Sequence, residues 1–206
     1  MLKVFRHFKK RSLIDLGKNF FHYYQERKFE AFTEKESRNI FKQLVRALSH
    51  IHKKGIVHLD IKLDNIMIDP ETHTVKLIDF GLCNFVTAEN EGKIKYRVGS
   101  EEYWAPEMVS EKIEPFSGAK VDVWCLGMVL YCLLNASFPF DPKKRTSFVR
   151  TTGVHPTFRF TQEISADAQD LIQKMLLVNP EERISLSGVM SHPWMKKSRS
   201  LKFWKN

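Results

Sequence analysis

Four polar residues that lie close together in the chain could perform chemistry. Asp60, Lys62 and Asn65 stand in the segment VHLDIKLDNIMID, between runs of apolar residues, and Asp79 follows the next apolar run. Two carboxylates and an amide, without a cluster of His or Cys, suit a hard cation such as Mg²⁺ better than zinc. Magnesium held by few protein oxygens takes its other ligands from water and phosphate, so this set indicates nucleotide chemistry. Lys62 beside it would neutralise charge on a phosphoryl group during transfer.

One long helix is expected before this set. The segment TEKESRNIFKQLVRALSHIHKKG, residues 33–55, repeats apolar residues at helical spacing. Thr33 and Glu36 fit a capping box at its start, and Gly55 is expected to cap its end. The helix therefore leads directly into the loop that carries Asp60.

A β-hairpin is expected after that loop. The short apolar runs Ile66–Ile68 and Val75–Ile78 flank the turn DPETH, a pattern typical of two antiparallel strands. Asp60 lies before the first strand, and Asp79 comes just after the second. Because a hairpin brings its two ends together, Asp60, Asn65 and Asp79 are expected to meet in one cleft.

The remaining segments predict a mainly helical α+β domain. We expect strands at 2–8 and 13–16, a short helix at 20–27, a loop from 81 to about 103, a buried helix at 121–134, an amphipathic helix at 166–177 and a last short helix at 185–190. A chain of 206 residues is long enough for one sizeable domain. No internal repeat or interdomain linker interrupts the sequence.

The composition is ordinary for a soluble globular protein, with 43% hydrophobic and 28% charged residues. We find no apolar run long enough to span a membrane, and the basic N-terminus has no apolar core for a secretory signal. A cytoplasmic location is the default expectation, with the nucleus as the alternative. The three cysteines, Cys83, Cys125 and Cys132, are expected to be reduced thiols, and the last two to be buried.

The formal net charge of +9 raises the question of a polyanionic partner. The basic residues are scattered, with small clusters at 9–11, 143–145 and 196–199. Scatter of this kind favours solvated faces and helix ends over a nucleic-acid footprint. We therefore expect neither a nucleic acid nor a membrane as a partner.

Five groups of motifs, in order along nearly the whole chain, resemble those of the eukaryotic protein kinases of serine/threonine type. They are HLDIKLDN (58–65), DFG (79–81), GSEEYWAPE (99–107), DVWCLG (122–127), and NPEERIS with HPW (179–185 and 192–194). The first matches the catalytic-loop pattern H-R-D-x-K-x-x-N at all fixed positions but one. HLDIKLDN and HPW are also similar to the calcium/calmodulin-dependent-like group. The resemblance implies a protein-kinase-like fold, mainly a helical large lobe with two remnant small-lobe strands.

The resemblance also implies ATP and Mg²⁺ as cofactors and a protein with Ser or Thr as substrate. Asp60 would accept or orient the proton of the substrate hydroxyl, and Lys62 would contact the γ-phosphate. Asn65 and Asp79 would bind Mg²⁺. The implied nucleotide contacts are Asp15, Leu16 and Gly17 in the hinge, Met67 beneath the base, and Lys62, Asn65 and Asp79 at the phosphates. Structural roles are implied for His58, Phe80, Gly81, Ser100, Glu107, Asp122 and Arg183.

Three of these structural roles are specific enough to test by geometry. Glu107 is expected to pair with Arg183 and brace the activation segment. Asp122 is expected to hold the backbone of the catalytic loop, and His58 to pack near the DFG segment. No functional role is expected for His50, His52, His73 and His155.

One departure from the family pattern concerns regulation. Leu59 replaces an arginine that most relatives carry and that normally pairs with a phosphate on the activation loop. Without it, no cation stands at that position to order the loop around a phosphate. We hypothesise that activity is independent of such a phosphate, and that Thr87, the obvious hydroxyl in the loop, is dispensable.

A second departure concerns the nucleotide clamp, because the sequence shows no glycine-rich loop, strand lysine or helix glutamate. The expected boundaries are a small-lobe remnant at 1–16, the large lobe at 17–195 and a basic tail at 196–206. Three explanations stay open: a fragment or truncated form of an active kinase, which we favour, a natural short form with little activity, and a catalytically silent kinase-like scaffold or binding module. In each case the missing small lobe or another covering partner is expected over the hinge strands.

Overall fold

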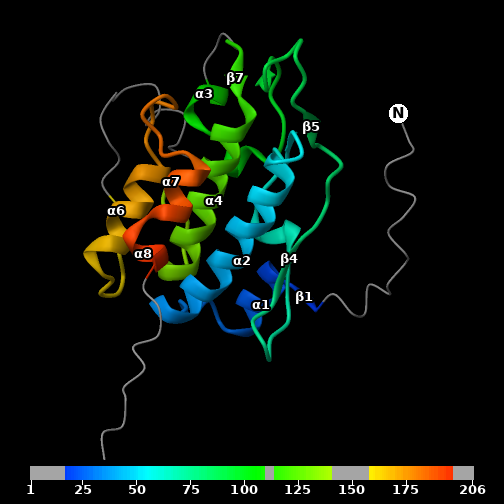
Figure 1. The fold of residues 1–206 in the computed structure, drawn as a ribbon. Coiled ribbons are helices and arrows are strands. Elements are labelled where there is room, and N and C mark those ends of the chain that lie inside the picture. Colours follow the sequence, from blue (N-terminus) through cyan, green and yellow to red (C-terminus); the bar gives the residue numbers. More distant parts are fainter. Residues whose placement is uncertain (1–16, 110–113, 141–157, 197–206) are drawn as a thin grey trace, which may run out of the picture.

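The computed structural model describes residues 17–109, 114–140 and 158–196, shown in Figure 1. The helices are α1 (Phe20–Glu26), α2 (Glu34–His52), α3 (Pro106–Val109), α4 (Gly118–Asn135), α6 (Ala166–Met175), α7 (Leu186–Ser191) and α8 (Pro193–Lys196), with the 3-10 turns η3 (Leu63–Asn65) and η4 (Glu101–Tyr103). The strands are β1 (Lys18–Asn19), β2 (Ile56–Val57), β3 (Ile66–Ile68), β4 (Val75–Leu77), β5 (Asn84–Phe85), β6 (Lys93–Ile94) and β7 (Phe116–Ser117). The strands predicted at 2–8 and 13–16 lie outside the described residues, so the domain boundaries near 16 and 196 stay predictions.

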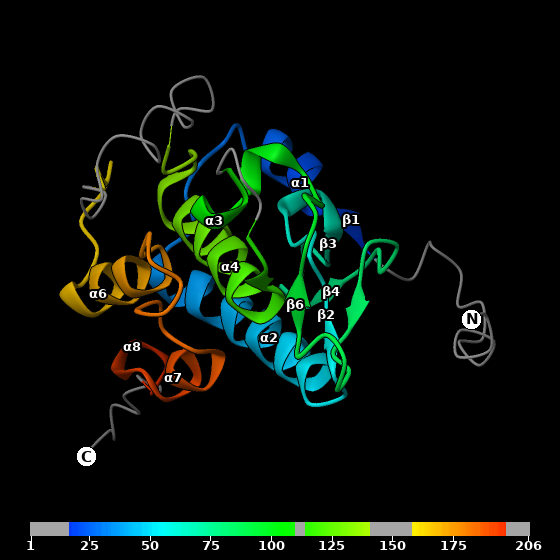
Figure 2. The ribbon, with the colours of Figure 1, turned by 90° about the horizontal axis from the view of Figure 1, so that it is seen from above.

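Helix α4 forms the centre of the core. It lies beside α2, with α6, α7 and α8 to one side of the pair (Figure 1, Figure 2). Nearly all its side chains are buried, as its apolar sequence predicts. By length and composition it could also cross a membrane, so the prediction that no segment passes that test is wrong. However, 89% of the helix is buried inside the fold, which is where a core helix places its apolar surface.

Helix α2 begins as the sequence predicts and ends slightly earlier. The capping box is confirmed: Thr33 Oγ1 accepts a hydrogen bond from the Glu36 backbone N–H at 3.3 Å, and Glu36 Oε2 accepts one from the Thr33 N–H at 2.9 Å. At the other end Lys53 is the cap residue. Gly55, predicted as the cap, lies two residues further on, with φ +69 in the turn to β2.

The strands form three small antiparallel sheets: β1–β3–β4, β2–β5 and β6–β7. The predicted hairpin is confirmed, with Ile66 opposite Leu77 and Ile68 opposite Val75. The segment from 81 to 103, predicted to be a loop, contains β5 and β6, which at two residues each are too short to show an alternating pattern. Helix α8 follows α7, so the helix predicted as the last one is not the last. These corrections leave the predicted mainly helical α+β fold intact.

Candidate active site

One buried carboxylate fixes the loop that follows β2. Asp122, near the start of α4, accepts hydrogen bonds from the backbone N–H groups of His58 and Leu59, each at 2.8 Å. The ring Nε2 of His52 lies 2.7 Å from the same carboxylate. Leu59 has φ +66, so the loop turns sharply at that residue. The core helix therefore holds the backbone from which Asp60 projects.

His52, for which no functional role is expected, makes a structural contact with Asp122. His52 occupies the last turn of α2 and positions the carboxylate that holds the loop. Its sequence context is that of any histidine near a helix end, so only the tertiary arrangement shows this contact. His155 lies outside the described residues.

The side chain of Asp60 is enclosed by partners from its own loop and from the segment before η4. It is 6% exposed. Its Oδ1 accepts hydrogen bonds from the backbone N–H and the Oγ of Ser100, both at 3.0 Å. Its Oδ2 accepts one from Asn65 Nδ2 at 2.8 Å and lies 3.1 Å from Lys62 Nζ. Lys62 Nζ in turn donates to Ser100 Oγ at 2.7 Å, which closes the network.

These partners set the charge of Asp60. Burial acts to raise the pKa of this carboxyl group, but the hydrogen bonds from Lys62 and Ser100, the Lys62 charge and the Asn65 amide outweigh it. The pKa of Asp60 is therefore lowered below its usual value. Asp60 is an ionised carboxylate at neutral pH, held in one orientation.

Asn65 and Asp79 supply oxygen atoms to the neighbouring space. The Ile78 N–H donates to the Asn65 carbonyl at 2.9 Å, so Asp79 follows directly beside Asn65. Asn65 Nδ2 donates to both the backbone oxygen and Oδ2 of Asp60, each at 2.8 Å. The amide oxygen of Asn65, Oδ1, therefore points away from Asp60. Asp79 is exposed, has φ +59, and accepts from the Gly81 N–H at 3.1 Å.

This donor set fits Mg²⁺. One carboxylate and one amide oxygen are few ligands, which suits an ion that completes its shell with water and phosphate. Within the part of the chain that the structure describes, no three His, Cys, Asp or Glu side chains gather as a metal cluster. A closed zinc-type site therefore has no set of ligands there.

The DFG segment packs on the loop as the sequence predicts. The ring of His58 lies 4.9 Å from the ring of Phe80, centroid to centroid, and its Nε2 lies 3.1 Å from the Ile78 carbonyl oxygen. Since Asp122 holds the His58 backbone, this contact links the position of Asp79 to that of the catalytic loop.

The predicted pair of Glu107 and Arg183 is confirmed. Arg183 is 1% exposed, and its Nη1 and Nη2 donate to the two carboxylate oxygens of Glu107 at 2.7 and 2.8 Å. Its Nε donates to the Leu177 carbonyl at 3.0 Å, and its guanidinium lies 5.0 Å from the ring centre of Trp124. This two-pronged pair fixes α3, and with it the end of the activation segment, to the core.

The expected nucleotide-contacting residues are placed in part. Gly17 has φ +86, and a Cβ atom there would lie 2.3 Å from the Ile68 carbonyl oxygen, so only glycine fits beside β3. Met67 lies in β3 opposite Asn19 and is half-buried. Asp15 and Leu16 lie outside the described residues, so their predicted contacts stay predictions.

Leu59 occupies an apolar environment instead of a phosphate-binding one. Its side chain is 2% exposed and lies among Val98, Val121 and Met108. A Cβ atom at Gly99, which has φ +81, would lie 2.4 Å from the Leu59 carbonyl oxygen, so the activation segment approaches the loop closely here. The segment is also paired at two places, β5 with β2 and β6 with β7.

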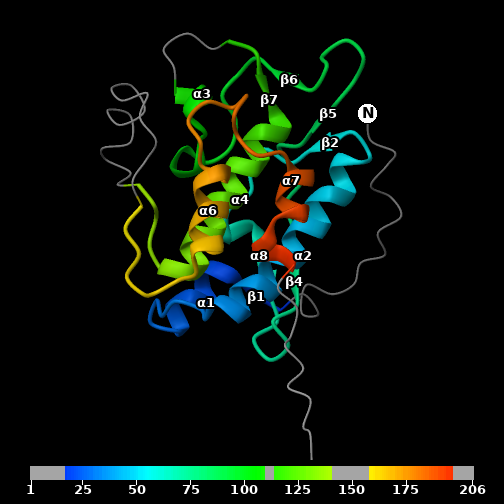
Figure 3. The ribbon, with the colours of Figure 1, turned by 60° about the vertical axis from the view of Figure 1, so that its left-hand side comes forward.

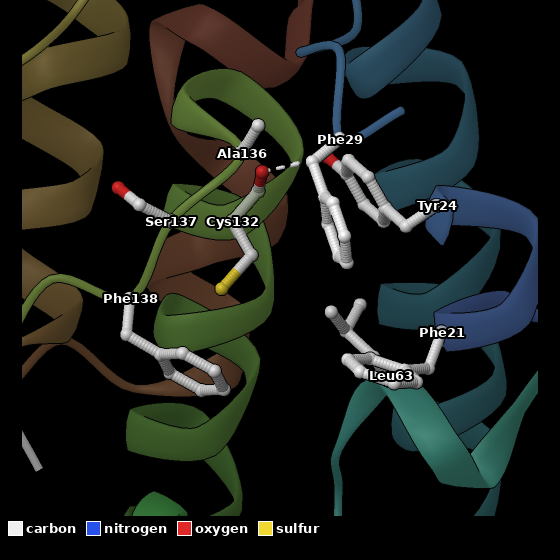
Figure 4. A pocket seen from close by; sticks show the side chains of 8 residues that line it. All are labelled: Phe21, Tyr24, Phe29, Leu63, Cys132, Ala136, Ser137 and Phe138. Carbon is white, nitrogen blue, oxygen red and sulfur yellow. Dashed lines mark hydrogen bonds between the residues drawn. The ribbon is translucent and has the colours of Figure 1, made fainter. Parts of the chain in front are cut away.

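An apolar cavity of about 120 Å³ lies beside the catalytic loop, between α1, η3 and the end of α4 (Figure 4). Leu63, three residues after Asp60, forms one wall, and Phe138, which is 36% exposed, forms another. Phe29 stands at its edge, 50% exposed, with φ +55. The other lining residues are Phe21, Tyr24, Cys132, Ala136 and Ser137. The sequence does not reveal this cavity, because aromatic residues in short helices and turns resemble ordinary core residues.

Comparisons with known proteins agree with this geometry. A family model described as "Protein kinase domain" matches residues 4–195. The chain is 37% identical to the carbon catabolite-derepressing protein kinase of Saccharomyces cerevisiae over 87% of its own length and 27% of that protein. It is 36% identical to the mitosis inducer protein kinase cdr1 of Schizosaccharomyces pombe over 88% of its length and 29% of that protein. The chain thus spans less than a third of the length of these curated relatives.

Proposed function

Because the chain belongs to the protein kinase family, we propose that it transfers the γ-phosphoryl group of ATP to a serine or threonine hydroxyl of a protein. The observation that best supports this proposal is the Asp60 carboxylate, enclosed, ionised and joined to Lys62 through Ser100. Relatives in this family are named serine/threonine protein kinases. A cytoplasmic location stays part of the proposal.

In this proposal Asp60 orients the attacking hydroxyl. A carboxylate with a lowered pKa is a weak base, so it accepts a hydrogen bond from the hydroxyl first and the proton only late in transfer. Lys62 places a positive charge where the transferred group gains negative charge. Asn65 Oδ1 and the Asp79 carboxylate would hold Mg²⁺, which when bound neutralises phosphate charge.

We further propose that the activation segment needs no phosphate. Leu59 fills its site with apolar contacts, and two short β-pairings and the Glu107–Arg183 pair hold the segment by other means. Thr87 already serves a local role, since its Oγ1 accepts from the Asn90 N–H at 3.3 Å in a turn.

The cavity beside Leu63 supports a finer proposal about the substrate. Leu63, which lines the cavity, lies three residues after Asp60, and three residues of chain span at most about 11 Å. A substrate whose hydroxyl lies at Asp60 can therefore place a side chain near that hydroxyl in this cavity. Its lining is apolar and aromatic, and a dry cavity of about 150 Å³ holds a molecule the size of benzene. We propose that it accepts a leucine-sized side chain.

Exposed apolar side chains next to the DFG segment support the proposal of a covering element. Leu82, Phe85 and Tyr96 are 45%, 50% and 52% exposed, and Asn84 Nδ2 lies 3.4 Å from Tyr96 Oη. Exposed apolar patches on a soluble protein commonly mark a surface that another element covers. The small lobe of a kinase domain, or a partner in its place, would provide that cover.

Phosphoryl transfer tests the proposal directly. The protein is incubated with γ-labelled ATP, Mg²⁺ and peptides that carry one serine, with leucine or alanine at successive positions around it. The proposal predicts label on serine, with transfer to leucine-containing peptides favoured by about tenfold at one position. ATP binding without any transfer would instead support the silent kinase-like scaffold.

A further inference from the structure

One surface of the molecule is rich in cations, and the carboxylates beside it, Glu34 and Asp170, already pair with Arg38 and His192. It is built by residues 37–56, which form most of α2 and the turn after it, and by residues 184–196, which include α7 and α8. Helices α7 and α8 pack against α2, on its side away from β1 and β3 (Figure 2, Figure 3). Neither segment contains Asp or Glu. We call this surface the basic face; its cations are Arg38, Lys42, Arg46, Lys53, Lys54 and Lys196.

Three of these cations stand at every fourth position of α2. Arg38, Lys42 and Arg46 are therefore neighbours on one ridge of the helix. Partial burial lowers the pKa of Lys42, and the positive charges of Arg38 and Arg46 lower it further. Like charges four residues apart weaken a helix, so folding alone does not favour this row.

Glu34, in the first turn of α2, pairs with Arg38 at one end of the ridge and leaves the middle of the ridge unpaired. Glu34 lies 2.5 Å from Arg38 Nη2, but the same carboxylate also accepts from Trp194 Nε1 at 2.9 Å and is committed to joining α2 with α8. Arg38 itself donates from Nε to the Trp194 carbonyl at 2.9 Å. Lys42 and Arg46 form no ion pair with any residue in the described ranges. Among the described residues, Lys42 and Arg46 are therefore cations of the ridge without an ion-pair partner; Arg46 is exposed and Lys42 is partly buried.

We propose that the basic face binds an extended acidic segment of a partner protein. Four residues of helix advance about 6 Å, and two residues of an extended chain advance about 6.6 Å. Acidic residues at alternate positions of such a segment would thus meet successive cations of the ridge. The ridge is one cation wide, which fits a single extended chain. Nucleic-acid affinity grows with the number of phosphates that cations neutralise, and the ridge offers three cations in a single row.

This interaction would be separate from the proposed phosphoryl transfer and does not depend on it. Helix α2 leads from the basic face into the loop of Asp60. A substrate protein held at the face by an acidic segment would therefore be present near the catalytic loop at a raised effective concentration.

Fluorescence anisotropy with the full chain tests the proposal. The probe is a fluorescein-labelled peptide in which glutamate alternates with threonine, at low salt. Lys42→Glu combined with Arg46→Glu is expected to weaken binding by about tenfold, because two attractive contacts become repulsive. The matched control, Lys28→Glu combined with Arg159→Glu, changes the net charge equally at exposed positions outside the basic face. It is expected to change Kd by less than about twofold.

Two further measurements keep the outcome decisive. The thermal midpoint of the Lys42→Glu, Arg46→Glu variant should stay close to that of the wild type, because the glutamate at position 42 would attract Arg38 while the two new glutamates repel each other as the two cations did, so lost binding would not reflect unfolding. A peptide with glutamine in place of glutamate should not bind. The proposal is overturned if the glutamate peptide fails to bind the wild type, or if both double variants weaken binding equally. Tighter binding of single-stranded DNA or of anionic vesicles than of the peptide would also overturn it.

Discussion

The two halves of the candidate site are held in different ways. Asp60 is 6% exposed and has hydrogen-bond partners on both carboxylate oxygens, and Asp122 beneath it is fully buried with three partners. Asp79, in contrast, is exposed, sits at a positive φ and accepts one bond from Gly81. We call the first the anchored half, comprising Asp60, Asn65, Ser100 and Asp122, and the second the open half, comprising Gly17, Met67 and Asp79.

The difference in burial matches a difference in task between the two halves, because one half would orient the substrate hydroxyl and the other would bind the ion and the nucleotide. Groups that orient a hydroxyl must be rigid before the substrate arrives, and the anchored half gains that rigidity from core helix α4. In the open half the Asp79 carboxylate is left accessible, because the ligand itself would supply its remaining partners, and Asn65, whose Oδ1 would share the ion, joins the two halves. Stability and ligand binding should therefore respond to different substitutions.

The largest effect is expected at the ion pair that extends the anchored half to α3. Arg183→Ala leaves Glu107 without its partner in a buried place and should lower the free energy of unfolding by about 4 kcal/mol. Arg183→Lys should recover only part of this, since lysine cannot form the two-pronged pair. Urea unfolding measures both. A loss below about 1 kcal/mol for Arg183→Ala would show that the pair does not brace the segment.

Asp122→Asn should cause the second-largest loss in the free energy of unfolding, because an amide nitrogen would then face the backbone N–H groups of His58 and Leu59. We expect a loss of about 3 kcal/mol in the free energy of unfolding. The matched change in the open half, Asp79→Asn, should cost less than about 0.5 kcal/mol, since that side chain is exposed. Equal losses for the two variants in the same urea titration would remove the distinction between the halves.

Acid should weaken the contacts of Asp60 in the anchored half. The folded pKa of Asp60 is lower than its unfolded value, so its stabilising effect is fully present above the unfolded pKa, near 4, and disappears as pH falls through the folded pKa. Asp60→Asn should therefore make the free energy of unfolding fall less steeply below about pH 4. Unfolding measured at a series of pH values checks this. An unchanged slope would mean that the Lys62 and Ser100 contacts do not favour the ionised form.

The smallest effect is expected in the activation segment. Thr87→Ala should leave phosphoryl transfer within about twofold of wild type, since no cation stands at position 59 to receive a phosphate. The reciprocal change, Leu59→Arg, places a buried charge among Val98 and Val121 and should lower activity unless the segment is phosphorylated. A large loss of transfer in Thr87→Ala would contradict phosphate independence.

The placement of Asp60 and Asn65 in the anchored half was predictable from local sequence, whereas Ser100 and Asp122 came from the family resemblance. Asp60, Lys62 and Asn65 are close in the chain, and the capping box at Thr33 and the apolar runs of the hairpin place them without long-range information. The pairing of Glu107 with Arg183 spans 76 residues and came from the family resemblance, not from any pattern in the residues themselves.

Other features could not be predicted because they depend on tertiary contacts alone. His52 meets Asp122 across 70 residues, and nothing near either residue signals it. The strands β5 and β6 are two residues long and show no alternation. The cavity beside Leu63 needs α1, η3 and the end of α4 to be placed together before it exists.

Calorimetric titration with ATP, in the presence and absence of Mg²⁺, tests the division between the two halves most directly. It compares the wild type with Asp79→Asn and Asp60→Asn. Mg²⁺ should strengthen ATP binding to the wild type and to Asp60→Asn, but not to Asp79→Asn, because only Asp79 offers an accessible carboxylate to the ion. Loss of the Mg²⁺ effect in Asp60→Asn, or its survival in Asp79→Asn, would contradict the account.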